Sequence, residues 1–245
     1  MTIELSPGAY GLVGPNAAGK TTLLRELHAK GDASLAPSAA DATFAGHTVG
    51  DHLACAHLAR PEFDDELASR ILGDTPRSAR VSALSAGQRR LLTLATALAS
   101  DKQTLLLDEP LDGLDISTRD KLRDVFIELL EDAARTIVIA THRAEDLVGL
   151  VDHVITVQDA EVSEPIELES AREDFPTLTG PVAVIDELAA GKKVLIRRTL
   201  GGSAAVTLAE RLSSSESVRA NAEKVEIATA DDHALINLLS AIERN

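Results

Sequence analysis

The chain has 245 residues, 39 of them acidic and 24 basic, which gives a formal net charge of −15, and it holds a single cysteine. This acidity argues against nucleic acid as a partner, which needs clustered Lys and Arg, and the lone thiol excludes an internal disulfide framework and fits a reducing cytosol. Since no run of about 18 apolar residues occurs and residues 1–7 lack the pattern of a signal peptide, we expect a cytoplasmic protein that reaches a membrane only through a partner.

Strands and helices alternate over the first 160 residues. Short, continuous apolar runs predict strands at 9–13, 104–107, 136–140 and 154–157, and such runs fit strands buried on both faces of a parallel sheet. Helical spacing of apolar residues predicts helices at 20–30, at 51–72 with a break at Pro61, at 88–99 and at 117–130. Residues 34–50 are typical of loops and short strands. The predicted fold class is therefore α/β, with a mostly parallel sheet flanked by helices.

The pattern changes after residue 160, where prolines punctuate an acidic stretch. Two strand-like runs, at 194–196 and 225–227, each precede a segment that we interpret as a helix, at about 205–212 and 231–243. We therefore expect two domains. The first spans 1–160, and the second is a small α/β appendage at 161–245.

A phosphate-binding pattern, G-x-x-x-x-G-K-[ST], lies between the first predicted strand and helix. Its glycines let backbone N–H groups surround phosphates, and the following helix adds a partial positive charge at its N-terminus. Lys20 is expected to reach the β- and γ-phosphates, and the Thr21 hydroxyl to bind Mg²⁺. The alternative is a glycine-rich turn with a surface lysine. The nucleotide-binding candidates here are Gly14, Pro15, Asn16, Ala17, Ala18, Gly19, Lys20, Thr21 and Thr22.

Two acids, Asp108 and Glu109, end the apolar strand at 104–107. In isolation two acids after a strand are usually a solvated loop. Beside a phosphate-binding loop, the first acid is placed to bind the metal, and the second to orient or deprotonate an attacking water. We therefore predict Asp108 as a metal ligand and Glu109 as a catalytic residue.

The segment Leu84-Ser85-Ala86-Gly87-Gln88 opens the next predicted helix. Ser85 is a good N-cap, which is a purely structural role. A turn of small residues at a helix N-terminus is also an anion site. Taken alone, the segment does not decide between the two.

Together these motifs resemble those of the nucleotide-binding subunits of ATP-binding cassette (ABC) transporters, over residues 6–160. The likeness implies a P-loop NTPase fold with a helical subdomain at about 48–100. It makes Ser85, Ala86, Gly87 and Gln88 the signature motif and places Asp112 in the family's D-loop. His142, after the strand at 136–140, falls at the position of the switch histidine, although a lone histidine there is usually a surface residue.

The resemblance also implies a mechanism, with ATP and Mg²⁺ as cofactors. Two subunits, as a homodimer or a heterodimer, meet head to tail around two Mg–ATP molecules, so that the Lys20 loop of one faces the Ser85 turn of the other. His142 contacts the γ-phosphate and holds Glu109 in line. An integral-membrane subunit converts the cycle into transport, and the chain lies peripherally on the inner face of the cell membrane.

Three departures from the family pattern stand out. Ala17 and Ala86 replace usual glycines, which is tolerable if neither backbone needs a positive φ. The family's glutamine between the P-loop and the signature is absent, and Ser38 stands in that place as a metal ligand of shorter reach, so we expect slower hydrolysis or altered coupling. The residue that stacks on adenine is unassigned, because Tyr10 is interpreted as core.

Several alternatives stay open. The tail and the compact helical segment favour export over import. Residues 48–83 form either a groove for the membrane partner or only a core. A nucleotide-binding regulatory module with little or no turnover is favoured by the missing glutamine and opposed by Lys20, Asp108 and Glu109. A soluble, non-transport ABC ATPase usually carries coiled coils or a second cassette, and neither occurs here.

Overall fold

The computed structural model describes residues 3–60 and 62–241. The expected helix break at Pro61 and the end of the last expected helix at Glu243 therefore lie outside the described residues. The chain divides into two compact units, residues 1–165 and residues 166–245, each of which is described by itself. The division comes five residues after the boundary expected from the sequence.

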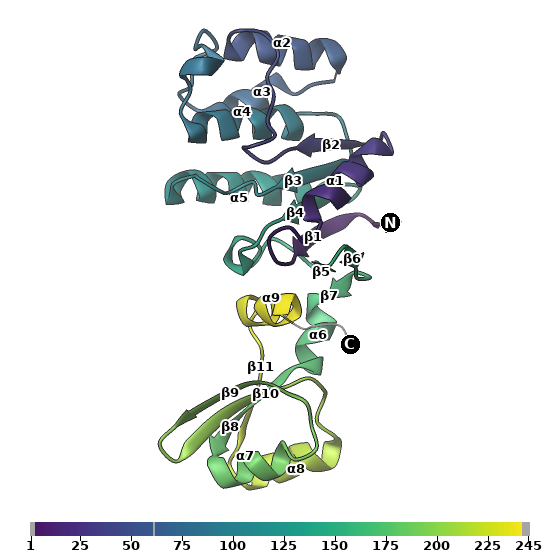
Figure 1. Cartoon of the computed structure of the whole chain (residues 1–245), viewed down its shortest axis with the longest axis vertical. Helices are drawn as coiled ribbons and strands as arrows, with labels where there is room; N and C mark the ends of the chain where they lie inside the picture. Colours follow the sequence, from purple (N-terminus) through teal and green to yellow (C-terminus); the bar gives the residue numbers. More distant parts are fainter. Residues whose placement is uncertain (1–2, 61, 242–245) are drawn as a thin grey trace. The chain divides into compact units, whose positions relative to one another are not determined.

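A mostly parallel sheet forms the centre of the first unit (Figure 1). Its strands lie in the order β2-β3-β4-β1-β5-β6, all parallel except β6, which runs antiparallel to β5. The pairing register places Leu12 of β1 beside Ala140 of β4, and Ala140 beside Asp108 of β3. These three strands therefore end in one row. Their bounds are β1 Gly8–Val13, β2 Ala33–Ala36, β3 Thr104–Asp108, β4 Thr136–Ala140, β5 His153–Gln158 and β6 Glu161–Val162.

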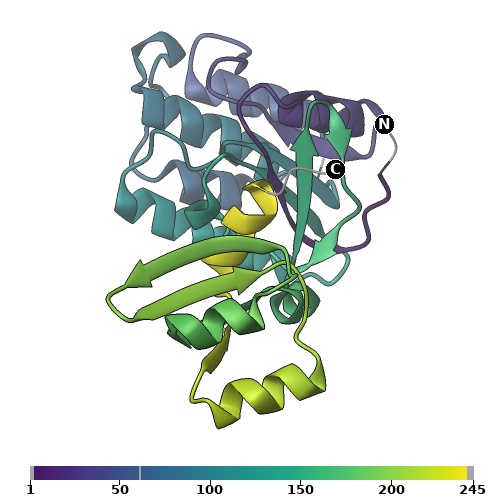
Figure 2. The ribbon, with the colours of Figure 1, turned by 60° about the horizontal axis from the view of Figure 1, so that its bottom comes forward.

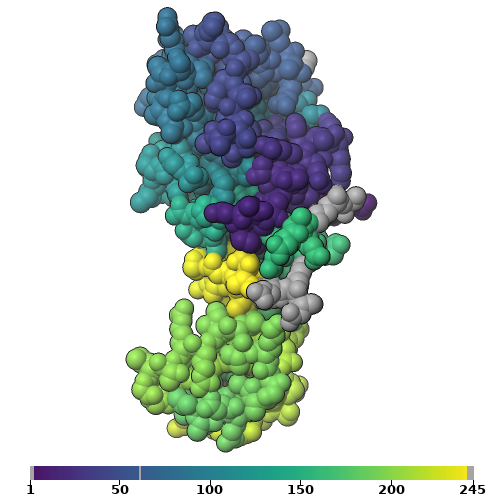
Figure 3. Space-filling model, viewed as in Figure 1, coloured from purple at the N-terminus to yellow at the C-terminus, as the bar shows by residue number. Residues whose placement is uncertain are grey.

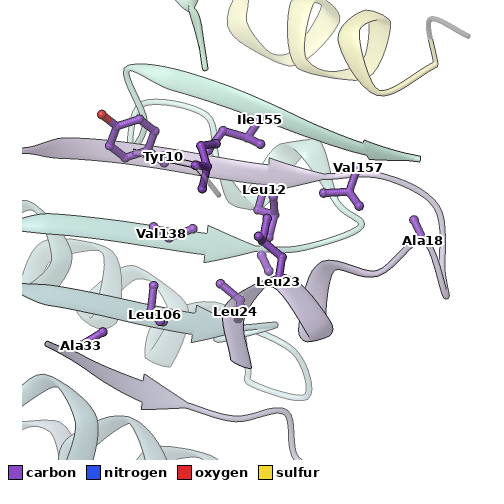
Figure 4. Packing of buried hydrophobic residues seen from close by; sticks show 12 residues of the cluster. Tyr10, Leu12, Ala18, Leu23, Leu24, Ala33, Leu106, Val138, Ile155 and Val157 are labelled. Atoms are coloured by element: carbon purple, nitrogen blue, oxygen red, sulfur yellow. The ribbon is translucent and has the colours of Figure 1, made fainter. Parts of the chain in front are cut away.

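The core lies on both faces of this sheet. Leu23 and Leu24 of α1 pack on Leu12, Val138 and other inward side chains of the strands (Figure 4). Side chains that alternate with these along β3 and β4 are buried as well, which agrees with the expectation of strands covered on both faces. Tyr10 belongs to this core, as expected, and its hydroxyl donates to the carbonyl oxygen of Ser6.

Helices flank the sheet of the first unit. They are α1 Lys20–Ala29, α2 Val49–Ala59, α3 Asp65–Leu72, α4 Ala86–Leu98 and α5 Ile116–Leu130, with short 3₁₀ turns at Val81–Ala83 and Ala144–Asp146. α3 packs against α4, and α5 packs against β4. In the space-filling view of Figure 3, α2 and α3, in blue tones, form one end of this unit. None of the described helices is long and apolar enough to span a membrane.

The connection from β1 to α1 is a tight turn that constrains its backbone. A Cβ at Gly14 would lie 2.0 Å from the carbonyl oxygen of Val157, so only glycine fits this position. Ala17, however, has a φ of 64°, in the left-handed region that costs an L-residue about 1–2 kcal/mol. We expected alanine to be tolerated where the backbone does not need a positive φ, and at Ala17 the backbone has one. Ala86, the first residue of α4, does not have a positive φ, so alanine is tolerated there as expected.

The second unit contains a four-stranded antiparallel sheet in the order β11-β8-β10-β9. Together with α7 and α8, these strands follow the β-α-β-β-α-β order of the ferredoxin-like motif (Figure 2). The bounds in this unit are β7 Ile166–Glu167, α6 Leu168–Asp174, β8 Pro176–Pro181, α7 Val182–Leu188, β9 Val194–Leu200, β10 Ser203–Leu208, α8 Ser214–Ala222, β11 Glu226–Thr229 and α9 Asp232–Ala241.

The helix expected at about 205–212 is wrong. Residues 203–208 form β10 instead, and Ala204, Val206 and Leu208 alternate into the core of this unit. This spacing of two residues is that of a half-buried strand, and the neighbouring Ala and Leu residues obscured it. The helix of this region, α8, begins later, at Ser214, where Ser213 and Glu216 form a capping box.

The left-handed backbone of Ala17 predicts that glycine is better at this position. Ala17→Gly should raise the free energy of unfolding by about 0.5–1 kcal/mol, because the relieved strain exceeds the added chain entropy. The matched control is Ala18→Gly, one residue later, where the alanine is buried and its φ is not positive. That change should lower stability by about 1 kcal/mol. Chemical denaturation measures both, and destabilisation by Ala17→Gly would contradict the assignment of strain.

Candidate active site

The loop before α1 is held by its own lysine. Lys20, the first residue of α1, is only 7% exposed, and its Nζ donates to the carbonyl oxygens of Gly14 at 2.7 Å and Pro15 at 3.1 Å. Burial lowers the pKa of Lys20, while the nearby carboxylates of Glu109 and Asp108 oppose this shift. The ammonium therefore binds carbonyl oxygens of the loop and lies near the carboxylates of Asp108 and Glu109.

Thr21 joins this loop to the end of β3. Its Oγ1 donates to Oδ2 of Asp108 at 2.8 Å. Burial raises the pKa of Asp108, and the Thr21 hydrogen bond counters part of that effect. The sequence predicted both residues as metal ligands, and the structure brings their oxygens together.

Glu109 and His142 meet across the neighbouring strand ends. Oε1 of Glu109 accepts from the backbone N–H of His142 at 3.1 Å and lies 2.9 Å from its Nδ1. Oε2 of the same carboxylate accepts from Oγ1 of Thr141 at 3.0 Å. The two predicted catalytic residues are thus in direct contact, and Thr141, which sequence reasoning missed, fixes the second carboxylate oxygen.

Lys20, Thr21, Asp108 and Glu109 line a cavity of about 230 Å³ at the carboxyl edge of the sheet, whereas His142 is not among the described residues that line it. Ser38, which follows β2, also lines it, and its Oγ donates to Oδ2 of Asp41 at 3.1 Å. The structure therefore brings Ser38 to the same cavity as the other predicted metal ligands. The lining residues are Asn16, Ala17, Gly19, Lys20, Thr21, Thr22, Ser38, Asp108 and Glu109.

The predicted signature residues lie elsewhere. Ser85 caps α4 through a capping box, in which Ser85 N–H donates to Oε1 of Gln88 and Gln88 N–H donates to Oγ of Ser85. Among the residues that the structure describes, those that line the cavity include none of 85–88. Gly87 instead neighbours Leu114 in the segment after β3, and Asp112 in that segment donates its N–H to the carbonyl oxygen of Glu109.

Arg90 is a second residue that the sequence did not predict for this site. It lies on α4, is 3% exposed, and donates to backbone carbonyl oxygens of Pro37, Asp108, Glu109 and Pro110. Burial lowers its pKa to about 10, so the guanidinium stays protonated at neutral pH. The signal was available, because Arg90 falls in register with the buried Leu94 and Ala97 on one face of the helix.

The donor groups fit a nucleotide and a magnesium ion. Mg²⁺ binds oxygen ligands and is usually held by one or two carboxylates together with substrate phosphates, which matches Asp108 and the hydroxyls of Thr21 and Ser38. The N-cap of α1 is Gly19, which has no side chain to cap the helix, so the first N–H groups of α1 face the cavity edge without a side-chain cap. Such a helix start favours phosphate.

A family model described as "AAA domain, putative AbiEii toxin, Type IV TA system" matches residues 66–145, about a third of the chain. The matched stretch includes α4, the Asp108–Glu109 pair and His142. It is therefore consistent with an ATPase-like core, and it covers too little of the chain to define the family by itself.

Curated relatives give a more complete match. The chain is 30% identical to the aliphatic sulfonates import ATP-binding protein SsuB 1 of Paracoccus denitrificans, over 67% of this chain and 74% of that protein. It is 33% identical to the Nod factor export ATP-binding protein I of Rhizobium etli, over 64% of this chain and 59% of that protein. With the sulfate/thiosulfate import ATP-binding protein CysA of Nocardia farcinica it shares 31% identity, over 67% of this chain and 58% of that protein.

The chain thus spans less than two thirds of the Rhizobium and Nocardia proteins and about three quarters of the Paracoccus protein. The names of these relatives share one description, an ATP-binding protein of import or export. The fold and the sequence motifs agree with that description. On this evidence the chain belongs to the family of ATP-binding subunits of ABC transporters.

Proposed function

We propose that this chain binds and hydrolyses ATP and thereby powers transport by a separate integral-membrane subunit. The observation that carries the proposal is the meeting of Thr21 with Asp108, and of Glu109 with His142, beside Lys20 at one sheet edge. The likeness to ATP-binding subunits supports it independently.

In this proposal the chain's own groups bind the phosphates. Lys20 exchanges its loop carbonyls for β- and γ-phosphate oxygens, and the N–H groups at the start of α1 donate to the same phosphates. Thr21, Asp108 and Ser38 hold Mg²⁺, which neutralises charge that develops on the phosphates. Their position in one cavity supports this assignment.

Glu109 orients or deprotonates the water that attacks the γ-phosphate. Its carboxylate is fixed at both oxygens, by Thr141 and by the backbone N–H of His142, so it is held in one orientation. His142 is half-exposed beside it, and we propose that it contacts the γ-phosphate and keeps Glu109 in line.

A complete site needs a second subunit, in a homodimer or a heterodimer. The start of α4, with Ser85 to Gln88, presents a helix N-terminus, yet the described residues of the cavity do not include it. We infer that this turn, with Asp112 of the adjoining segment, meets the nucleotide held by the other subunit. There the helix dipole stabilises γ-phosphate charge.

The direction of transport stays a prediction. The relatives include both import and export proteins, so the expected export rests on the appendage and the compact helical segment alone. We place the chain on the inner face of the cell membrane through its partner. A nucleotide-binding module with little turnover is the second candidate, because Ser38 stands where the family has glutamine.

The proposal predicts Mg²⁺-dependent ATP turnover by the purified chain that rises faster than linearly with protein concentration, because two copies complete each site. Glu109→Gln should abolish turnover and leave ATP binding intact, since the amide keeps the shape but cannot take a proton. Phosphate release measured over a series of protein concentrations tests both points.

Turnover that persists in Glu109→Gln would refute the catalytic assignment. Tight ATP binding without turnover in the unaltered chain would favour the regulatory module. A strictly linear dependence on concentration would contradict the two-copy site.

Ser38 offers a separate test. Its hydroxyl lines the cavity but is shorter than the amide of glutamine, so Ser38→Gln should raise turnover several-fold by bringing an oxygen closer to the metal and the water. Ser38→Ala serves as the control and should lower it. Steady-state phosphate release with all three chains gives the comparison, and identical rates would remove Ser38 from the mechanism.

A further inference from the structure

A single buried arginine, Arg90, donates hydrogen bonds to four backbone carbonyl oxygens around the candidate active site. Nη2 of Arg90 donates to the carbonyl oxygens of both Asp108 and Glu109, and its Nε donates to that of Pro110 at 3.2 Å. Its Nη1 donates to the carbonyl oxygen of Pro37, the residue before Ser38. One side chain of α4 therefore binds three successive carbonyls from the last residue of β3 onward and a fourth just after β2.

The three successive carbonyls converge because the backbone turns sharply at Glu109. Its φ is 49°, in the left-handed region that a residue with a side chain rarely adopts. The Glu109 N–H donates to the carbonyl oxygen of Ala140 at 2.8 Å, which pins the other side of the same peptide. A strained conformation persists only where its surroundings enforce it. The guanidinium of Arg90 and the carbonyl group of Ala140 at the end of β4 are the groups that do so here.

We infer that Arg90 is a positioning residue, which holds Glu109 in this left-handed conformation and thereby keeps its carboxylate against Thr141 and His142. The contacts above support the positioning of Glu109 by Arg90, and the effect of Arg90 on catalysis rests on the proposed function. It follows that a shift of α4, or of the loop after β2, moves the carboxylate. The position of α4, which begins at the predicted signature motif, is thereby linked to the orientation of the Glu109 carboxylate.

The geometry calls for arginine specifically. The planar guanidinium offers five donors in a fixed fork, whereas the ammonium of lysine is a compact point charge with three. Arg90→Lys keeps the charge but cannot reach all four carbonyls together. Arg90→Met removes the donors and leaves an apolar chain of similar length.

A second arginine supplies the matched control. Arg123 of α5 also donates to backbone carbonyl oxygens, those of Asp146 and Val148, and neither belongs to the Glu109 turn. Arg123→Lys therefore removes the same kind of contact at a different place. A general loss of stability should lower the activity of both variants alike, whereas loss of a positioning role should lower only that of Arg90→Lys.

The first test is kinetic. Arg90→Lys should lower kcat about tenfold and Arg90→Met about 100-fold, with KM for ATP within about twofold of the original, as expected for a misplaced catalytic group. Arg123→Lys should keep kcat within about twofold. Equal kcat losses in Arg90→Lys and Arg123→Lys, or a loss that appears only in KM, would overturn the inference. If Arg90→Met fails to fold, Arg90→Lys carries the test.

A second readout needs no turnover, so it separates this inference from the proposed function. The imidazole signal of His142, identified by its loss in His142→Gln, should shift in nuclear magnetic resonance spectra when Glu109→Gln is introduced. In the Arg90→Lys background the same change should leave the signal unmoved, because the contact is already lost. An equal shift in both backgrounds would overturn the inference even in a chain that does not hydrolyse ATP. An inactive chain that passes this test would refute only the proposed function.

Discussion

The parallel register of β1, β4 and β3 is the constraint on which the rest of the site depends. It sets Leu12, Ala140 and Asp108 in one row, so the three segments that leave these strands begin side by side. The first segment carries the turn to Lys20, the second carries Thr141 and His142, and the third begins with Glu109. Because carboxyl ends of parallel strands meet at one edge, residues as far apart in the sequence as Asn16 and Glu109 line a common cavity. A slip of one residue in any of these strands would turn its side chains to the other face.

Charge at this edge is balanced over short distances. Asp108 and Glu109 are adjacent acids in a largely buried setting, and Lys20 on α1 and Arg90 on α4 are the buried cations that face them. The two cations do different work in our account. Lys20 binds carbonyls of the loop that we expect to receive phosphate, and Arg90 binds carbonyls of the turn that carries the carboxylate. The first contact is one that a nucleotide can replace, whereas the second belongs to the fold.

Local patterns in the sequence predicted most of this arrangement. The short apolar strands and the spacing of the phosphate-binding pattern were sufficient to place Lys20, Thr21, Asp108 and Glu109 at one edge. The left-handed backbone of Ala17 and of Glu109 was not predictable, because tertiary packing and not local preference enforces it. Helical spacing was sufficient to place Arg90 on the buried face of its helix, but its role was missed because its partners are carbonyl oxygens, which no sequence pattern marks. In the second unit, the three alternating core residues of β10 were too short a signal among Ala and Leu residues to exclude a helix.

The central claim is that the edge formed by β1, β3 and β4 binds Mg–ATP through Lys20. Calorimetric titration of ATP into the full chain, with and without Mg²⁺ and beside the Lys20→Ala variant, measures this directly. The account predicts Mg²⁺-dependent binding by the original chain that weakens at least about tenfold in the variant, since a hydrogen bond to a charged group contributes about 1.5–3 kcal/mol. Equal affinity in the two chains, or no binding of ATP by the original chain, would contradict the account.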